Sequence, residues 1–165
     1  IMKYSEGQIE RFASTGGWTL GTKQPAELFA SAPLVVLTRE QQARVEEAAQ
    51  LIYRPCCNNP TLFPDCNHGM AMLGLLELMA AQDVGTDEML AAAKYVNAFW
   101  FPQQTLEVAA FFQANGGPDF AEIEPRQIVS ANFSSSAGFQ QVRQWLATSG
   151  LLEQGDGGGS GGCSP

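Results

Sequence analysis

Apolar residues along the middle of the chain recur every three or four positions, which is the spacing that predicts amphipathic helices. The segment 38–53 shows this pattern with the apolar stripe Val45, Ala48, Ala49 and Ile52. At its start, Thr38 and Gln41 have the spacing of a capping box, in which the two side chains bind the unpaired amides of a helix N-terminus. We therefore predict a helix over 38–53 with one buried and one charged face.

The segment 68–82 is apolar almost all round and carries Glu77 as its one charged residue. A helix with this composition is typical of the interior of a protein. Asn67 directly precedes it, and asparagine is a favoured N-cap residue. We expect residues 68–82 to form a buried central helix with Asn67 as its cap.

Other segments with helical spacing are separated by glycine- and proline-containing stretches, and Pro102 should interrupt the helical pattern on its two sides. They are 5–14, 25–29, 86–100, 103–114, 125–131 and 135–148. The one strand-like run is 35–37, and it has no partner. The sequence predicts an all-α fold, an irregular bundle of five to six helices around the central helix, with a cysteine-rich loop over 54–67.

Composition supports one globular domain, predicted over residues 1–152, followed by a glycine-rich tail over 153–165. The chain has 165 residues, of which 45% are hydrophobic, and its net charge is −8. This charge disfavours binding to nucleic-acid phosphates and to anionic membrane surfaces. No apolar run reaches the roughly 18 residues of a membrane-spanning helix, so we expect neither nucleic acid as a partner nor a transmembrane segment.

The candidate chemistry lies in one loop, where Cys56, Cys57, Cys66 and the single histidine, His68, fall within a short stretch. One interpretation is two disulfides. A bond between the adjacent Cys56 and Cys57 would be strained, so we expect one bridge to Cys66 and one to Cys163, which would tether the tail. An even number of cysteines favours an oxidising compartment, which makes the protein periplasmic or secreted.

A second interpretation of the same loop is a site for copper or zinc, because thiolates and imidazole suit these ions. Cys66 and His68 would stand at the positive end of the central helix, which favours the thiolate. Met72 follows His68 by four residues, on the same helix face. The spacing matches no standard zinc module, since the chain lacks a Cys-x-x-Cys pair.

A third interpretation is a thiol enzyme, with Cys57 or Cys66 as nucleophile and His68 as base. Cys66 and His68 are two positions apart, a separation that usually points side chains away from each other. The chain also has no Cys-x-x-Cys redox motif. We therefore expect binding rather than catalytic turnover.

Aromatic residues gather before Pro102, at Phe99, Trp100 and Phe101. Exposed, they would form a docking surface for a protein partner; buried, they would belong to the core. Together, the patterns favour an extracytoplasmic helical binding or accessory domain that is cross-linked by disulfides around Cys56–His68. The alternative is a soft-metal-binding protein that uses Cys56, Cys57, Cys66 and His68, with Cys163 as a further candidate ligand.

Overall fold

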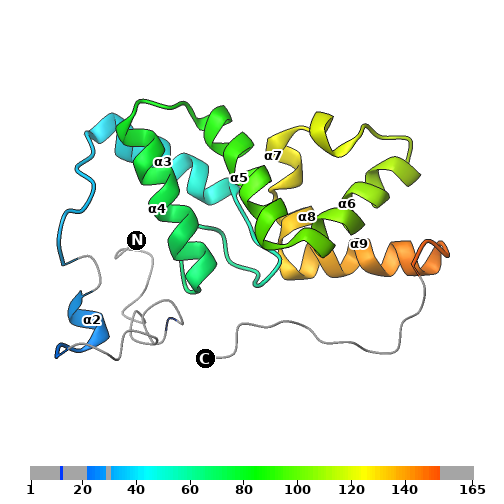
Figure 1. Cartoon of the computed structure of the whole chain (residues 1–165), viewed down its shortest axis with the longest axis horizontal. Coiled ribbons are helices and arrows are strands. Elements are labelled where there is room, and N and C mark those ends of the chain that lie inside the picture. The colour runs from blue at the N-terminus through cyan, green and yellow to red at the C-terminus, as the bar shows by residue number, and fades with distance from the viewer. Residues whose placement is uncertain (1–11, 13–21, 29–30, 153–165) are drawn as a thin grey trace. The chain divides into compact units, whose positions relative to one another are not determined.

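The computed structural model describes residues 12, 22–28 and 31–152, and every regular element within them is helical (Figure 1). The all-α prediction is confirmed, and residues 35–37 form no strand. The elements are α2 (Pro25–Leu28), α3 (Arg39–Leu51), α4 (Asn67–Ala81), α5 (Thr86–Trp100), α6 (Pro102–Ala114), the 3-10 turn η3 (Phe120–Glu122), α7 (Pro125–Ile128), α8 (Ala131–Ser134) and α9 (Ser136–Thr148). The predicted helix over 5–14 lies outside the described residues.

Contacts divide the chain into two compact units, each of which is considered by itself. The described part of the first unit ends at Gln50 and resumes over Asn59–Met89, so it holds most of α3 and all of α4. The described part of the second unit consists of Leu51–Asn58 and residues 90–152, with most of α5 and all later helices. The predicted single domain over 1–152, with a tail tethered through Cys163, extends beyond the described residues and stays a prediction.

The helices of the first unit follow the apolar pattern. All four residues of the predicted stripe of 38–53 are buried, although Ile52 follows the end of α3 and belongs to the second unit. Helix α4 buries Met72, Leu76 and Ala80 along one face, whereas Leu78 on the other side is 53% exposed. The central helix is therefore covered on one face, and part of its apolar surface stays at the surface of the molecule.

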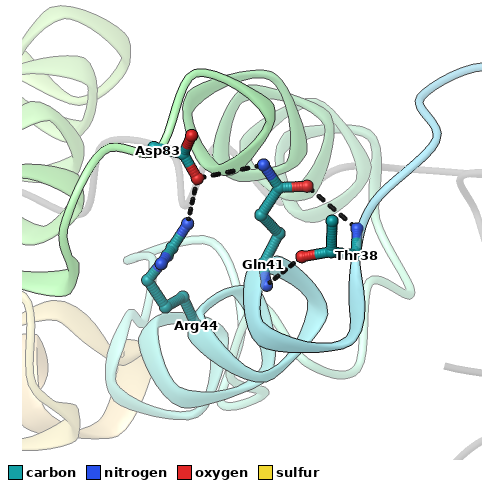
Figure 2. A network of polar contacts seen from close by, with 4 residues as sticks. All are labelled: Thr38, Gln41, Arg44 and Asp83. Carbon is teal, nitrogen blue, oxygen red and sulfur yellow. Dashed lines mark hydrogen bonds and ion pairs between the residues drawn. The ribbon is translucent and has the colours of Figure 1, made fainter.

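The capping box at the start of α3 is confirmed (Figure 2). The backbone N–H of Gln41 donates to Thr38 Oγ1 at 3.2 Å, and the backbone N–H of Thr38 donates to Gln41 Oε1 at 2.9 Å. Gln41 Nε2 and Arg44 Nη2 also donate to Asp83 Oδ1, at 3.1 and 2.9 Å. These hydrogen bonds lower the pKa of Asp83, and the one from Gln41 has the largest effect. The network ties the start of α3 to the turn after α4.

Aromatic packing and a close helix contact hold the second unit together. The ring centroids of Phe112 and Phe133 lie 4.9 Å apart, and those of Phe111 and Trp145 lie 5.0 Å apart. Helix α9 passes so close to α8 that a Cβ added at Gly138 would lie 2.5 Å from the Asn132 carbonyl oxygen. The packing of α9 against α8 therefore depends on a residue without a side chain at this position.

Two sequence predictions about element ends are changed by the structure. Pro102 separates α5 from α6 as predicted, but α6 begins at Pro102 itself and not at residue 103. In the first turn of a helix, the missing N–H of proline costs no hydrogen bond. The predicted helix over 125–131 is instead two short helices, α7 and α8. They separate at Ser130, whose extended backbone, with φ −68° and ψ 166°, starts α8 as its N-cap.

Candidate thiol site

The entry to the cysteine loop is held by hydrogen bonds of the second unit. The Tyr53 N–H donates to the Val129 carbonyl at 2.8 Å, and Asn97 Nδ2 donates to the Tyr53 carbonyl at 2.9 Å. A turn follows, closed by the Cys57 N–H on the Arg54 carbonyl at 3.3 Å. The backbone that leads to the first two cysteines is thus fixed on both sides of Tyr53.

The start of α9 fixes Cys57 in turn. The first N–H groups of a helix have no partner within it, and here the loop supplies acceptors for two of them. The Ser136 N–H donates to the Cys57 carbonyl at 2.9 Å, and the Ala137 N–H donates to Asn58 Oδ1 at 2.8 Å. The loop therefore caps α9, and α9 holds the backbone of the loop in place.

The loop ends at the N-cap of α4, which is not the residue that the sequence predicted. The N-cap of α4 is Cys66, whose Sγ accepts the Gly69 N–H at 3.3 Å. Asn67 is exposed and is the first residue of the helix, so the prediction that it is the cap was wrong. The reason is chemical, since a sulfur here takes the position that a serine or aspartate oxygen usually fills.

The loop brings three thiols together. The Sγ atoms of Cys56, Cys57 and Cys66 all lie within 4.8 Å of one another. Cys66 is buried, and the other two are half-buried. No disulfide joins these three residues in the structure, and the predicted partner Cys163 lies outside the described residues. The sequence therefore located the cluster correctly, while the predicted bridges stay a prediction.

Two donors of positive character face the sulfurs. Arg54 is fully buried, and its Nη2 donates to Cys57 Sγ at 3.3 Å. The N-terminus of α4 approaches Cys66 Sγ through the Gly69 N–H. Charge-assisted hydrogen bonds and a helix N-terminus both stabilise a negative sulfur. Arg54 was not predicted as part of the site, although a charged residue directly before Pro55-Cys56-Cys57 was a visible signal in the sequence.

Two further predicted ligands lie on α4. His68 is half-buried in the first turn of α4, and its ring nitrogens are not among the ligand atoms that gather with the three sulfurs. Met72 is fully buried one turn further along α4. Their role as metal ligands stays a prediction.

The predicted partner-binding residues divide by exposure. Phe99 is 84% exposed, whereas Trp100 and Phe101 are half-buried. Tyr95 and Leu106, on the neighbouring turns of α5 and α6, are also exposed. A docking role for Phe99 therefore meets the requirement of exposure and stays a prediction.

The fold and the loop together define a helical protein that gathers three thiols beside a buried arginine. No family model, no curated protein and no solved structure matches the chain. Within the described ranges, none of the helices has both the length and the apolar character that a membrane crossing requires.

Proposed function

We propose that the loop 56–66 binds a soft metal ion through the thiolates of Cys56, Cys57 and Cys66. The observation that carries this proposal is the mutual approach of the three Sγ atoms to within 4.8 Å. Metal–thiolate bonds are about 2.3 Å long, so sulfurs that share one ion lie about 4 Å apart. Side-chain rotations that move the sulfurs closer together by less than about 1 Å would let all three bind one ion.

The charge of the surroundings supports this binding. Three thiolates around a monovalent ion carry a net charge of −2, which is costly to place in a partly buried site. The Arg54 guanidinium and the Gly69 N–H each approach one of these sulfurs at 3.3 Å. Such donors around the ligands typically change metal affinity by about 10- to 100-fold when they are removed.

Cu(I) is the ion that this ligand set favours. Structural zinc sites are almost always four-coordinate, whereas the cluster supplies three ligands. Thiolates suit Cu(I) as they suit zinc, but Cu(I) is held well by three donors and needs no fourth. Zinc would require a further ligand, for which His68, two residues after Cys66, is the candidate.

The same proximity supports a second candidate, the disulfide-linked extracytoplasmic binding domain. Two sulfurs within 4.8 Å need only side-chain rotation to reach bonding distance. That bond would consume two of the three metal ligands, so the two proposals exclude each other in one molecule. The redox state of the three thiols therefore decides between them.

The test is a Cu(I) titration of the whole chain, reduced with a non-thiol reductant under anaerobic conditions, against a chromophoric Cu(I) chelator. We expect one ion per chain and ultraviolet absorption from thiolate-to-copper charge transfer. Cys56→Ser, Cys57→Ser and Cys66→Ser should each weaken binding by about 100-fold or more, since each removes a ligand, and Arg54→Gln by about tenfold.

Two matched variants control the experiment. Cys163→Ser removes the one cysteine that the proposal does not use, and it should leave stoichiometry and affinity unchanged. His68→Ala should leave Cu(I) binding unchanged and weaken zinc. Equal binding by the native chain and Cys66→Ser would contradict the metal site. A blocked thiol pair among residues 56, 57 and 66 in the denatured, unreduced protein would favour the disulfide.

A further inference from the structure

The three sulfurs of the loop differ in how far solvent reaches them. Cys56 and Cys57 are half-buried, whereas Cys66 is 6% exposed. Their Sγ atoms all lie within 4.8 Å of one another, and no disulfide joins them. A small oxidant therefore has access to the first two sulfurs, while Cys66 is placed to react with a neighbour. An accessible thiol beside a second thiol is typical of cysteines that are oxidised reversibly.

The buried Arg54 favours Cys57 as the sulfur that is oxidised first. Its Nη2 donates to Cys57 Sγ at 3.3 Å. A cation at this distance stabilises the thiolate, which is the form of cysteine that attacks a peroxide. One turn carries both residues, since the Cys57 N–H donates to the Arg54 carbonyl at 3.3 Å. Local backbone structure therefore holds the guanidinium beside this sulfur.

Cys66 is the partner that the loop offers for a second step. A disulfide between the adjacent Cys56 and Cys57 would be strained, whereas Cys66 needs only side-chain rotation to reach Cys57. In the structure, Cys66 Sγ accepts the Gly69 N–H at 3.3 Å as the N-cap of α4. A disulfide sulfur carries no negative charge and accepts a hydrogen bond more weakly. A bridge to Cys57 would therefore weaken the cap of α4.

We propose that a hydroperoxide oxidises Cys57 and that Cys66 then closes a disulfide with it. In the first step, the Cys57 thiolate attacks one peroxide oxygen and the O–O bond breaks. Cys57 becomes a sulfenic acid, and the other oxygen takes up a proton and leaves as water. In the second step, Cys66 attacks the Cys57 sulfur, and the sulfenic hydroxyl leaves as water with the Cys66 proton. The two thiols lose two electrons, which the peroxide accepts.

The bridge would regulate the metal site, and this consequence rests on the proposed function. A bond between Cys57 and Cys66 consumes two of the three thiol ligands, so the oxidised loop would not take up Cu(I). Reduction of the bridge restores both ligands. Metal binding and disulfide formation would then be two alternative states of one loop, and the peroxide level would select between them.

The test treats the whole chain, reduced and free of metal, with one equivalent of hydrogen peroxide. Tandem mass spectrometry after alkylation then locates the bridge. We expect a bond between Cys57 and Cys66 that a phosphine reverses. Cys66→Ser should stop at a sulfenic acid on Cys57, which dimedone labels. A bridge from Cys56 to Cys66, or dimedone on Cys56 in place of Cys57, would overturn the proposal.

Three variants and one amide sharpen the result. Cys56→Ser is the matched control, because it removes a metal ligand and should still form the bridge at the native rate. Arg54→Gln should slow oxidation by about tenfold, and Arg54→Lys, which keeps the charge, should recover part of the rate. In the bridged native chain, the Gly69 amide should exchange with solvent about fivefold faster, as expected for a weakened N-cap. An unchanged rate in folded Arg54→Gln would overturn the role of Arg54.

A Cu(I) titration of the reduced and the bridged chain separates this proposal from the metal site. Binding by the reduced chain and none by the bridged chain would support both. A chain that forms the bridge between residues 57 and 66 but binds no Cu(I) when reduced would contradict the metal site alone. A chain that binds Cu(I) when reduced but forms no bridge with peroxide would overturn the oxidation alone.

Discussion

Two regions of this protein use similar polar groups in opposite surroundings. In the network of Thr38, Gln41, Arg44 and Asp83 (Figure 2), the Asp83 side chain is 78% exposed, so water competes for the contacts of its carboxylate. At a small cavity within the second unit, Lys94 and Asn97 are 4% and 5% exposed. Exposed ion pairs contribute about 0–1 kcal/mol, whereas an unsatisfied buried group costs about 1–3 kcal/mol. Burial, and not the identity of the donors and acceptors, decides which region governs stability.

The largest effect should come from the close contact between α8 and α9 in the second unit. Gly138→Ala would place a Cβ 2.5 Å from the Asn132 carbonyl oxygen, where only backbone could move away. We expect a loss of roughly 3 kcal/mol or more in the free energy of unfolding, measured by chemical denaturation. Gly74→Ala is the matched control, because a Cβ there meets nothing within 4 Å.

Because Gly74 lies within α4, alanine there should stabilise the helix by about 0.5–1 kcal/mol. Equal stability changes for the two glycine variants would contradict the description of the α8–α9 contact. They would also mean that the space around Gly138 and the space around Gly74 do not differ.

A smaller effect is expected in the exposed network. Thr38→Ala removes the hydroxyl that accepts the Gln41 N–H, at 3.2 Å. Loss of an N-cap side chain costs about 1 kcal/mol, so urea denaturation should show a destabilisation of this size. Thr38→Ser keeps the hydroxyl and should stay close to the native value. A loss above about 3 kcal/mol in the free energy of unfolding would show that the exposed network contributes as much to stability as a buried one.

The smallest effect should come from Glu77, a half-buried carboxyl between these two extremes. Burial raises its pKa above 4.5, so the folded chain holds the proton more tightly than the unfolded chain. The stabilisation from protonation is fully present below pH 4.5 and is lost as the pH rises through the raised pKa. Glu77→Gln should therefore be more stable than the native chain at pH 7, by roughly half a kcal/mol or less.

The difference between Glu77→Gln and the native chain should shrink as the pH falls toward 4.5. Denaturation midpoints of the two chains, measured from pH 7 to pH 4, check this expectation. A gap that widens in acid would mean that the carboxylate form of Glu77 is the one that the fold stabilises.

Features that depend on neighbours in the chain were predictable from the sequence. The capping box needs two residues three positions apart, and the apolar stripe of α3 needs only helical periodicity. The thiol cluster was also located, because Cys56, Cys57 and Cys66 share one loop. Its neighbour Arg54 was missed although it lies only three residues before Cys57, because spacing alone does not show that this side chain is buried and donates to the sulfur.

The sequence by itself determined the helices, their approximate ends and the loop that carries the three cysteines, since local backbone preferences and apolar periodicity act over a few residues. Tertiary structure alone decided which face of α4 is covered, that Cys66 rather than Asn67 caps it, and that Gly138 must lack a side chain. It also assembled the cavity of Lys94 and Asn97 from several helices. Burial and hydrogen-bond partners are properties of the packed chain, and they assign an energetic weight to each polar group that residue type alone does not carry.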